Sequence, residues 1–140
     1  MNHYSFSDCY VGMKTEFKVQ VTGEKMNMFR EITGDLNPLH SDETFAQNHN
    51  YKGKVAFGLL TAAFTSTLAG VHIPGEQSLI HEVSYKFIKP VYVGDELSIF
   101  GEIVEVDERT KQLMLKIKAR RVADEVLVLR GKMIVGFLGE

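Results

Sequence analysis

The sequence lacks the features that mark a disulfide-bonded, secreted or membrane-spanning protein. Cys9 is the only cysteine, so no disulfide can form within the chain. The first residues lack the basic and apolar runs of a signal peptide, and the longest uncharged stretch, 55–71, is short for a membrane span and contains several hydroxyl groups. We therefore expect a protein of the reducing cytoplasm in which Cys9 is a spectator thiol.

A charge excess of one sign and a metal-binding pattern are also missing. The 16 basic and 18 acidic residues are interspersed and leave a net charge of −2, which argues against a nucleic-acid platform or a polybasic membrane surface. No group of His, Cys or carboxylate residues has the spacing of metal ligands, and no glycine-rich phosphate loop occurs. We expect no metal and no other cofactor.

The chain has 140 residues, of which 44% are hydrophobic and 24% charged, and this suits one domain with one sizeable core. No repeat, low-complexity segment or linker divides it, so we predict a single domain over 1–140. The second half is strand-rich, with strands predicted at 78–89, 96–106, 112–122 and 125–137. Helices followed by successive antiparallel strands imply the α+β class.

Apolar periodicity predicts the elements of the first half. A helix at 58–69 is uncharged and apolar or small on all sides, so we expect it to be buried at the centre of the domain. Before it we predict a strand at 15–21 and then a helix that Thr22 caps and Gly34 ends, with Met26, Phe29 and Ile32 at three-residue spacing. A short helix follows from about 41, with Phe45 and Ala46 facing inward. The helix at 58–69 is expected to end at Gly70.

The most informative segment reads Ile-Thr-Gly-Asp-Leu-Asn-Pro-Leu-His and places a carboxylate and an imidazole five residues apart. Gly34 lets the chain turn out of the preceding helix, while Pro38 fixes one φ angle and biases Asn37 away from helical geometry. A stiff loop carrying Asp35 and His40 suits general acid–base chemistry, in which placement matters as much as pKa. Ordinary turn formation would use the same residue types.

This loop resembles the GD-x-NP-x-H signature of the (R)-specific enoyl-CoA hydratases, the MaoC-like branch of the hot-dog fold, at every defined position. Residues 54–60 are similar to the family's approach to its central helix, and 83–97 to its strand segment with an aromatic, Lys, Pro-Val and Gly-Asp. The resemblance covers most of the chain. It implies a sheet wrapped around a long buried central helix, and a homodimer with each substrate channel at the interface.

The resemblance also implies a site. Asp35 and His40 match the acid–base pair that holds one water, which adds to a trans-2-enoyl thioester of CoA or of an acyl carrier protein. Gly58, at the start of the central helix, is expected to offer its N–H to the thioester oxygen, although a glycine there also suits packing alone. The expected substrate-binding residues are Asn37, Phe57, Leu59, Lys86 and Lys89.

The chain departs from the family at two positions. Phe57 stands where a His often precedes the helix glycine, and Ala63 stands where a hydroxyl often supports the Asp. Thr61 or Thr65, from the same helix face, is a candidate replacement for that hydroxyl. Two alternatives to a hydratase therefore stay open: a hot-dog thioesterase, against which the Asp and His spacing counts, and a non-catalytic acyl-binding domain, which the departures favour.

Overall fold

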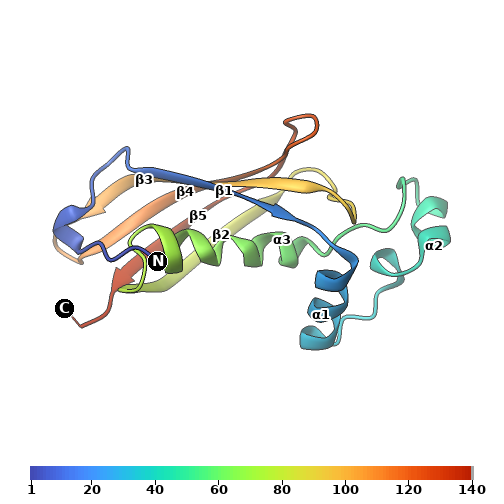
Figure 1. Cartoon of the computed structure of the whole chain (residues 1–140), viewed down its shortest axis with the longest axis horizontal. Helices are drawn as coiled ribbons and strands as arrows, with labels where there is room; N and C mark the ends of the chain where they lie inside the picture. The colour runs from blue at the N-terminus through green and yellow to red at the C-terminus, as the bar shows by residue number, and fades with distance from the viewer. Residues whose placement is uncertain (140) are drawn as a thin grey trace.

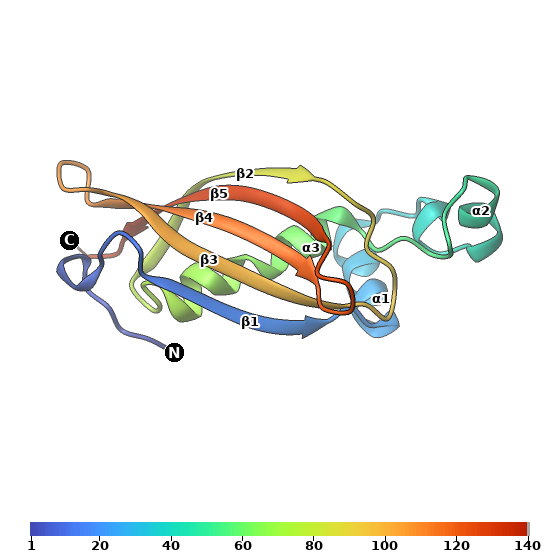
Figure 2. The same cartoon turned by 90° about the horizontal axis from the view of Figure 1, so that it is seen from above.

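Five antiparallel strands form one sheet in the computed structural model, which describes residues 1–139. The strands are β1 (Lys14–Gln20), β2 (Ser78–Phe87), β3 (Glu96–Asp107), β4 (Gln112–Arg121) and β5 (Leu127–Phe137). Their order across the sheet is β1-β3-β4-β5-β2, so β1 and β2 are the edge strands (Figure 2). The predicted strands are confirmed, with boundaries that differ by at most two residues.

Helices cover one face of this sheet and extend beyond one end of it. Figure 1 shows α3 lying along the sheet, whereas α1 and α2 lie past its end. Within residues 1–139, none of the helices combines the length and the apolar character that crossing a membrane requires. The helical segments are η1 (Phe6–Asp8), α1 (Gly23–Thr33), η2 (Pro38–His40), α2 (Glu43–Asn48), α3 (Gly58–Phe64) and η3 (Leu68–His72).

Helix α1 begins and ends where the sequence predicts. The Thr22 hydroxyl accepts a hydrogen bond from the N–H of Lys25 (3.1 Å), and Gly34 ends the helix with a φ of 72°, a left-handed conformation that glycine adopts without strain. Met26 is buried, as expected. Ile32 is not, because α1 projects past the sheet and leaves this side chain 82% exposed.

The central helix differs from the prediction at its end and on one side. Gly70 does not end it, since helical turns continue beyond Thr65 as far as His72. The side that faces the sheet is buried, but Leu59 on the other side is 64% exposed and Ala63 is exposed as well. The sequence predicts burial all round, whereas the single sheet of one chain covers only one side of the helix.

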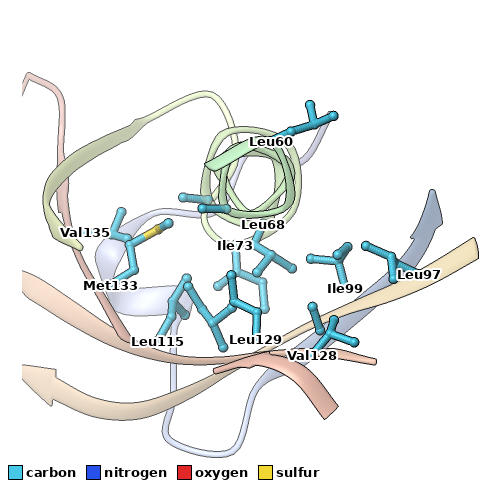
Figure 3. Packing of buried hydrophobic residues seen from close by; sticks show 14 of the residues in the cluster. Leu60, Leu68, Ile73, Leu97, Ile99, Leu115, Val128, Leu129, Met133 and Val135 are labelled. Carbon is cyan, nitrogen blue, oxygen red and sulfur yellow. The ribbon is translucent and has the colours of Figure 1, made fainter. Parts of the chain in front are cut away.

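The hydrophobic core lies between the central helix and the inner face of the sheet. Figure 3 shows Leu68 and Ile73 on the sheet-facing side of the helix, opposite Leu115 and Leu129, and each of the four is at most 2% exposed. Strands β3 and β4 alternate between buried and more exposed residues over most of their length, as strands with one face on a core do. Gly101 on β3 permits a close approach, because a Cβ there would lie 3.2 Å from a methyl carbon of Leu68.

Cys9 is a free, buried thiol beside η1. Burial, together with the charge of Asp8, raises its pKa from 9.0 to about 11. At pH 8 the reactive thiolate is therefore scarce, and we expect iodoacetamide to alkylate Cys9 on the order of 100-fold more slowly than in the urea-unfolded chain. Equal rates in the folded and unfolded chains, measured by intact mass, would show that the thiol is accessible and unperturbed.

Candidate active site

Local hydrogen bonds hold the loop between α1 and α2 in one conformation. The hydroxyl of Thr33 accepts from the N–H of Asp35 (3.2 Å), and the Asp35 carboxylate accepts from the N–H of Asn37 (3.1 Å). The side-chain oxygen of Asn37 in turn accepts from the N–H of Leu39 (3.0 Å). Pro38, whose fixed φ suits a first helical residue, begins the turn η2. These bonds and the fixed φ of Pro38 support the stiff loop that the sequence predicts.

The imidazole of His40 is held from two sides. Its Nδ1 lies 2.7 Å from the carbonyl oxygen of Val55. Because a carbonyl can only accept, Nδ1 carries a proton, and in the neutral ring Nε2 keeps its lone pair. The ring also packs against Phe57 at a centroid distance of 4.2 Å, and Phe57 packs against Phe29 at 4.8 Å. His40 is thus oriented, with Nε2 available for proton transfer.

A cavity of about 310 Å³ lies beside this imidazole. Its walls come from the start of α3, the end of β2 with the connection that follows it, and β5. The residues that matter most for its chemistry are His40, Gly58, Thr61, Phe87, Lys89 and Leu129. Most of the remaining wall is apolar, so the cavity suits a small apolar chain that ends in a polar group near His40.

The structure brings together only part of the predicted set of site residues. His40, Gly58 and Lys89 line the cavity, and Phe57 lies behind His40 as its stacking partner. Within residues 1–139, no hydrogen bond joins the side chains of Asp35 and His40, because the Asp35 carboxylate bonds to its own loop. The predicted residues that do not line the cavity are Asp35, Asn37, Leu59 and Lys86.

Lys86 is excluded from the cavity by the alternation of side chains along β2. Because Phe87 lines the cavity, the neighbouring Lys86 must point to the other face of the sheet. There it lines a groove of about 600 Å³ whose other basic residues are Lys116, Lys118, Arg120, Arg130 and Lys132. Lys89 lies after the end of β2, so the alternation of side chains along the strand does not apply to it.

The cavity residues that the sequence prediction does not name include Phe87 and Tyr51. The position of Phe87 follows from strand alternation once Tyr85 on the same face is known to contact the helix. Tyr51 lies in an irregular loop, where no periodic pattern assigns a direction to a side chain. Strand alternation therefore places Phe87 only after a contact of Tyr85 is known, and no pattern places Tyr51.

Gly58 is the first residue of α3, and two features of its surroundings favour glycine. A Cβ there would lie 3.1 Å from ring carbons of Phe87, which is tighter than an ordinary contact. N–H groups in the first turn of a helix also have no intrahelical acceptor, so the N–H of Gly58 is open to a ligand. The glycine thus combines close packing with an accessible donor at the cavity wall.

The two candidate hydroxyls on the central helix differ in their bonding. The hydroxyl of Thr65 donates to the carbonyl of Ala62 (2.6 Å), so the hydroxyl of Tyr85 must donate to Thr65 (2.5 Å). The hydroxyl of Thr61 has no partner, although Thr61 is only 2% exposed and lines the cavity. Thr61, and not Thr65, is therefore the free hydroxyl of the site.

This difference predicts that valine substitution lowers stability at Thr65 but not at Thr61. Thr65→Val leaves the Tyr85 hydroxyl without its partner, so we expect the free energy of unfolding to fall by about 1–3 kcal/mol. Thr61→Val removes an unpartnered group while keeping its shape, so we expect no loss or a small gain. Urea denaturation measures both variants. An equal loss for Thr61→Val would mean that its hydroxyl has a partner within the free protein.

Backbone hydrogen bonds connect the loop to the connection after β2, which lines the same cavity. The N–H of Val55 donates to the carbonyl of Leu39 in the loop (3.1 Å). The next N–H, that of Ala56, donates to the carbonyl of Val91 in the connection after β2 (2.7 Å). The loop that carries His40 and the connection after β2 are therefore both bonded to one intervening segment.

The Pro-Val-x-x-Gly-Asp segment completes this wall with a turn. Gly94 has a φ of 101°, which favours glycine, and the Asp95 carboxylate accepts from the N–H of Tyr92 (2.9 Å). Arg121 lies 3.4 Å from Asp95 and donates to the carbonyl of Pro90 (3.1 Å). The turn itself thus explains why Gly and Asp occur at positions 94 and 95, and no contact with a ligand is needed to explain them.

Taken together, the cavity offers an oriented proton-transfer group, a free backbone donor and apolar walls. Residues 1–139 contain no group of three His, Cys, Asp or Glu side chains placed to hold a metal ion. A cation, Lys89, stands at the cavity for an anionic part of a ligand. This arrangement suits proton transfer on a small acyl compound that carries a carbonyl oxygen.

Comparison with known proteins finds relatives over most of the chain. The profile of the MaoC like domain family matches residues 10–126. The 3-hydroxybutyryl-CoA dehydratase of Methylorubrum extorquens is 32% identical over 130 residues, which make up 93% of this chain and 82% of that protein. The (R)-specific enoyl-CoA hydratase of Aeromonas caviae is 32% identical over 98 residues, covering 70% of this chain and 73% of the relative. The solved structure of the (R)-hydratase from A. caviae involved in PHA biosynthesis superposes with a TM-score of 0.88 at 27% identity, over 92% of this chain and 97% of that one.

Proposed function

Because the chain belongs to the MaoC-like domain family, we propose that Asp35 and His40 catalyse the addition of water to trans-2-enoyl thioesters and its reversal. The protein has the hot-dog fold and is a hydro-lyase that interconverts trans-2-enoyl and (R)-3-hydroxyacyl thioesters. The observation that carries the assignment of roles is the imidazole of His40, oriented by Val55 at the wall of the cavity.

Hydration divides into two proton transfers and one charge to be stabilised. A base removes a proton from water as its oxygen attacks C3, and an acid delivers a proton to C2. Asp35 and the Nε2 atom of His40 share these two transfers around one water. The N–H of Gly58 donates to the thioester oxygen, on which negative charge builds through conjugation with C2. Stabilising that oxygen lowers the barrier for attack at C3.

The other predicted residues serve binding in this proposal. Lys89 meets a phosphate of CoA or of a carrier-protein arm, and Asn37 braces the loop through its bond to Leu39. Phe57 replaces the family's His and supports the ring of His40 by stacking. Leu59, exposed beside Gly58, is available to contact the substrate from the open side of the helix.

We further propose that a second copy of the chain completes the site. In one chain the loop is open to water, since Asp35 is exposed and Leu36 is 74% exposed. The edge strand β2 also exposes Val83 (45%) and Phe87 (53%), and the outer side of α3 exposes Leu59 (64%). Pairing two copies along β2 would extend the sheet and cover apolar surface on both.

We expect a dimer at micromolar concentration by sedimentation velocity, and a monomer for Val83→Lys. In a two-fold dimer the substitution occurs in both chains, so two lysine charges would lie in the apolar interface. Burying these charges without partners is unfavourable, and the dimer should dissociate. Val104→Lys is the matched control, because Val104 is 41% exposed on the internal strand β3. A monodisperse wild-type monomer with full activity would contradict the dimer.

One assay with crotonyl-CoA tests the function. We expect the enoyl absorbance to fall without release of free thiol, because water adds to C3 and the thioester survives. Release of thiol would identify a thioesterase instead. Binding without either signal would identify a non-catalytic acyl-binding domain.

We also propose that residues 1–140 act as one domain in the cytoplasm. One hydrophobic cluster runs from Phe6 to Val135, which supports a single unit. Cys9 is a free thiol, as is usual in a reducing compartment. The proton transfers and N–H donation described above need no metal and no organic cofactor.

A further inference from the structure

Thr61 carries the one buried side-chain nitrogen or oxygen atom in residues 1–139 that lacks a hydrogen-bond partner. The residue is 2% exposed and lines the cavity beside His40. A buried hydroxyl without a partner destabilises a protein relative to an apolar group of the same shape. Valine has that shape, so folding alone gives no reason for a threonine here.

The backbone of the helix does not bond this hydroxyl. A threonine in a helix usually donates to the carbonyl three or four residues earlier, and Thr33 and Thr65 do so at 2.8 and 2.6 Å. For Thr61 the carbonyl four residues earlier belongs to Phe57. That oxygen already accepts from the N–H groups of Leu60 (3.1 Å) and Thr61 (3.3 Å). The hydroxyl is left to a group inside the cavity.

The position of Thr61 indicates which part of a ligand it meets. Gly58 and Lys89, which are exposed, mark the mouth of the cavity, whereas Val128 and Leu129 are 1% exposed and mark its inner wall. Thr61 lies on the same helix face as Gly58, about 4.5 Å further along the axis. If the thioester oxygen lies at Gly58, this spacing is roughly the distance from the carbonyl carbon to C4 of an extended acyl chain. Thr61 therefore lies near C4.

We propose that the natural substrate carries a hydroxyl or oxo group near C4 of its acyl chain, and that Thr61 selects it by a hydrogen bond. The inference rests on the proposed function, which sets the thioester at Gly58. A threonine hydroxyl both donates and accepts, so it fits either group. A plain alkyl chain that fills the cavity would leave it unpaired. A carboxylate fits less well, because the apolar inner wall offers no neutralising cation.

The test measures binding of unreactive ligands by titration calorimetry. The pair is 4-oxopentanoyl-CoA and pentanoyl-CoA, which are saturated and cannot be hydrated. We expect the wild type to bind the oxo compound about tenfold or more tightly than its partner, because one hydrogen bond to an otherwise unpaired buried group is at stake. Thr61→Val should bring the ratio of the two dissociation constants to about one, and Thr61→Ser, which keeps the hydroxyl, should retain the preference.

The controls separate this inference from the proposed function. Thr67→Val changes a helix threonine outside the cavity and should keep the wild-type ratio. Equal binding of the two thioesters by the wild type, or an unchanged ratio in Thr61→Val, overturns the role of Thr61. If Thr61→Val does not fold, Thr61→Ala answers the same question. Failure to hydrate crotonyl-CoA overturns the proposed function instead, because the binding ratio does not depend on turnover.

Discussion

Asp35→Asn and His40→Ala are each expected to abolish most hydratase activity while the fold survives. Asparagine matches the size of Asp35 but cannot take up the proton, and alanine removes the imidazole altogether. Losing one acid–base partner lowers the rate on the order of 10²–10⁴-fold. Asp35 is exposed, so its replacement disturbs no core packing. Steady-state hydration of crotonyl-CoA, with a melting curve for each variant, provides the measurement.

The chain contains a matched control for the histidine. His49 is held as His40 is, with Nδ1 2.8 Å from a backbone carbonyl and its ring 4.3 Å from the Phe45 ring. It does not line the cavity, so His49→Ala should leave turnover near the wild-type value.

The double variant tests whether the pair acts together. Both groups handle the same water, so removing both should be little worse than removing one. A single variant that keeps more than about a tenth of wild-type turnover would show that the assigned pair is wrong. If both single variants fail to fold, the loop has a structural role and not a catalytic one.

Gly58→Val is expected to reduce turnover far more than stability. The new Cβ would lie 3.1 Å from the ring of Phe87, and the branched side chain would also obstruct the approach of a thioester to the N–H. Loss of one donor to a developing oxyanion lowers the rate on the order of 10²–10³-fold. The close atoms belong to the Phe87 side chain and not to the backbone, so the ring can shift and the melting temperature should fall only slightly.

Gly70→Val is the matched control for this substitution. Gly70 lies in the same helical segment, and a Cβ there would meet nothing within 4 Å. Both variants place a β-branched residue in a helix, but only the one at position 58 touches the cavity. Wild-type kcat in a folded Gly58→Val protein would remove Gly58 from the site.

Local chemistry explains which parts of the site could be predicted from the sequence. The cap at Thr22, the left-handed Gly34 and the turn at Pro38 depend on residues within a few positions of each other, so their conformations follow from the residue types. The same holds for the turn at Gly94. These elements fix the loop and the order of helix and strands.

Contacts between distant segments account for what could not be predicted. Lys86 and Lys89 look equivalent in the sequence, and only the end of β2 at Phe87 decides that Lys89 reaches the cavity. The difference between Thr61 and Thr65 depends on Tyr85, which lies 20 residues from Thr65. The apolar pattern of the central helix predicts that Leu59 is buried, but the sheet of one chain covers only one side of this helix and leaves Leu59 exposed.

The segment around Val55, bonded to the loop through Leu39 and to the cavity wall through Val91, also affects the thermodynamics of binding. Ordering a residue's backbone lowers conformational entropy by an amount worth about 1–2 kcal/mol at room temperature. Here folding itself orders the loop and the connection after β2, so a substrate does not have to order them when it binds. A site on a mobile loop loses part of its binding free energy to ordering the loop. The affinity of this preorganised site is not reduced in that way.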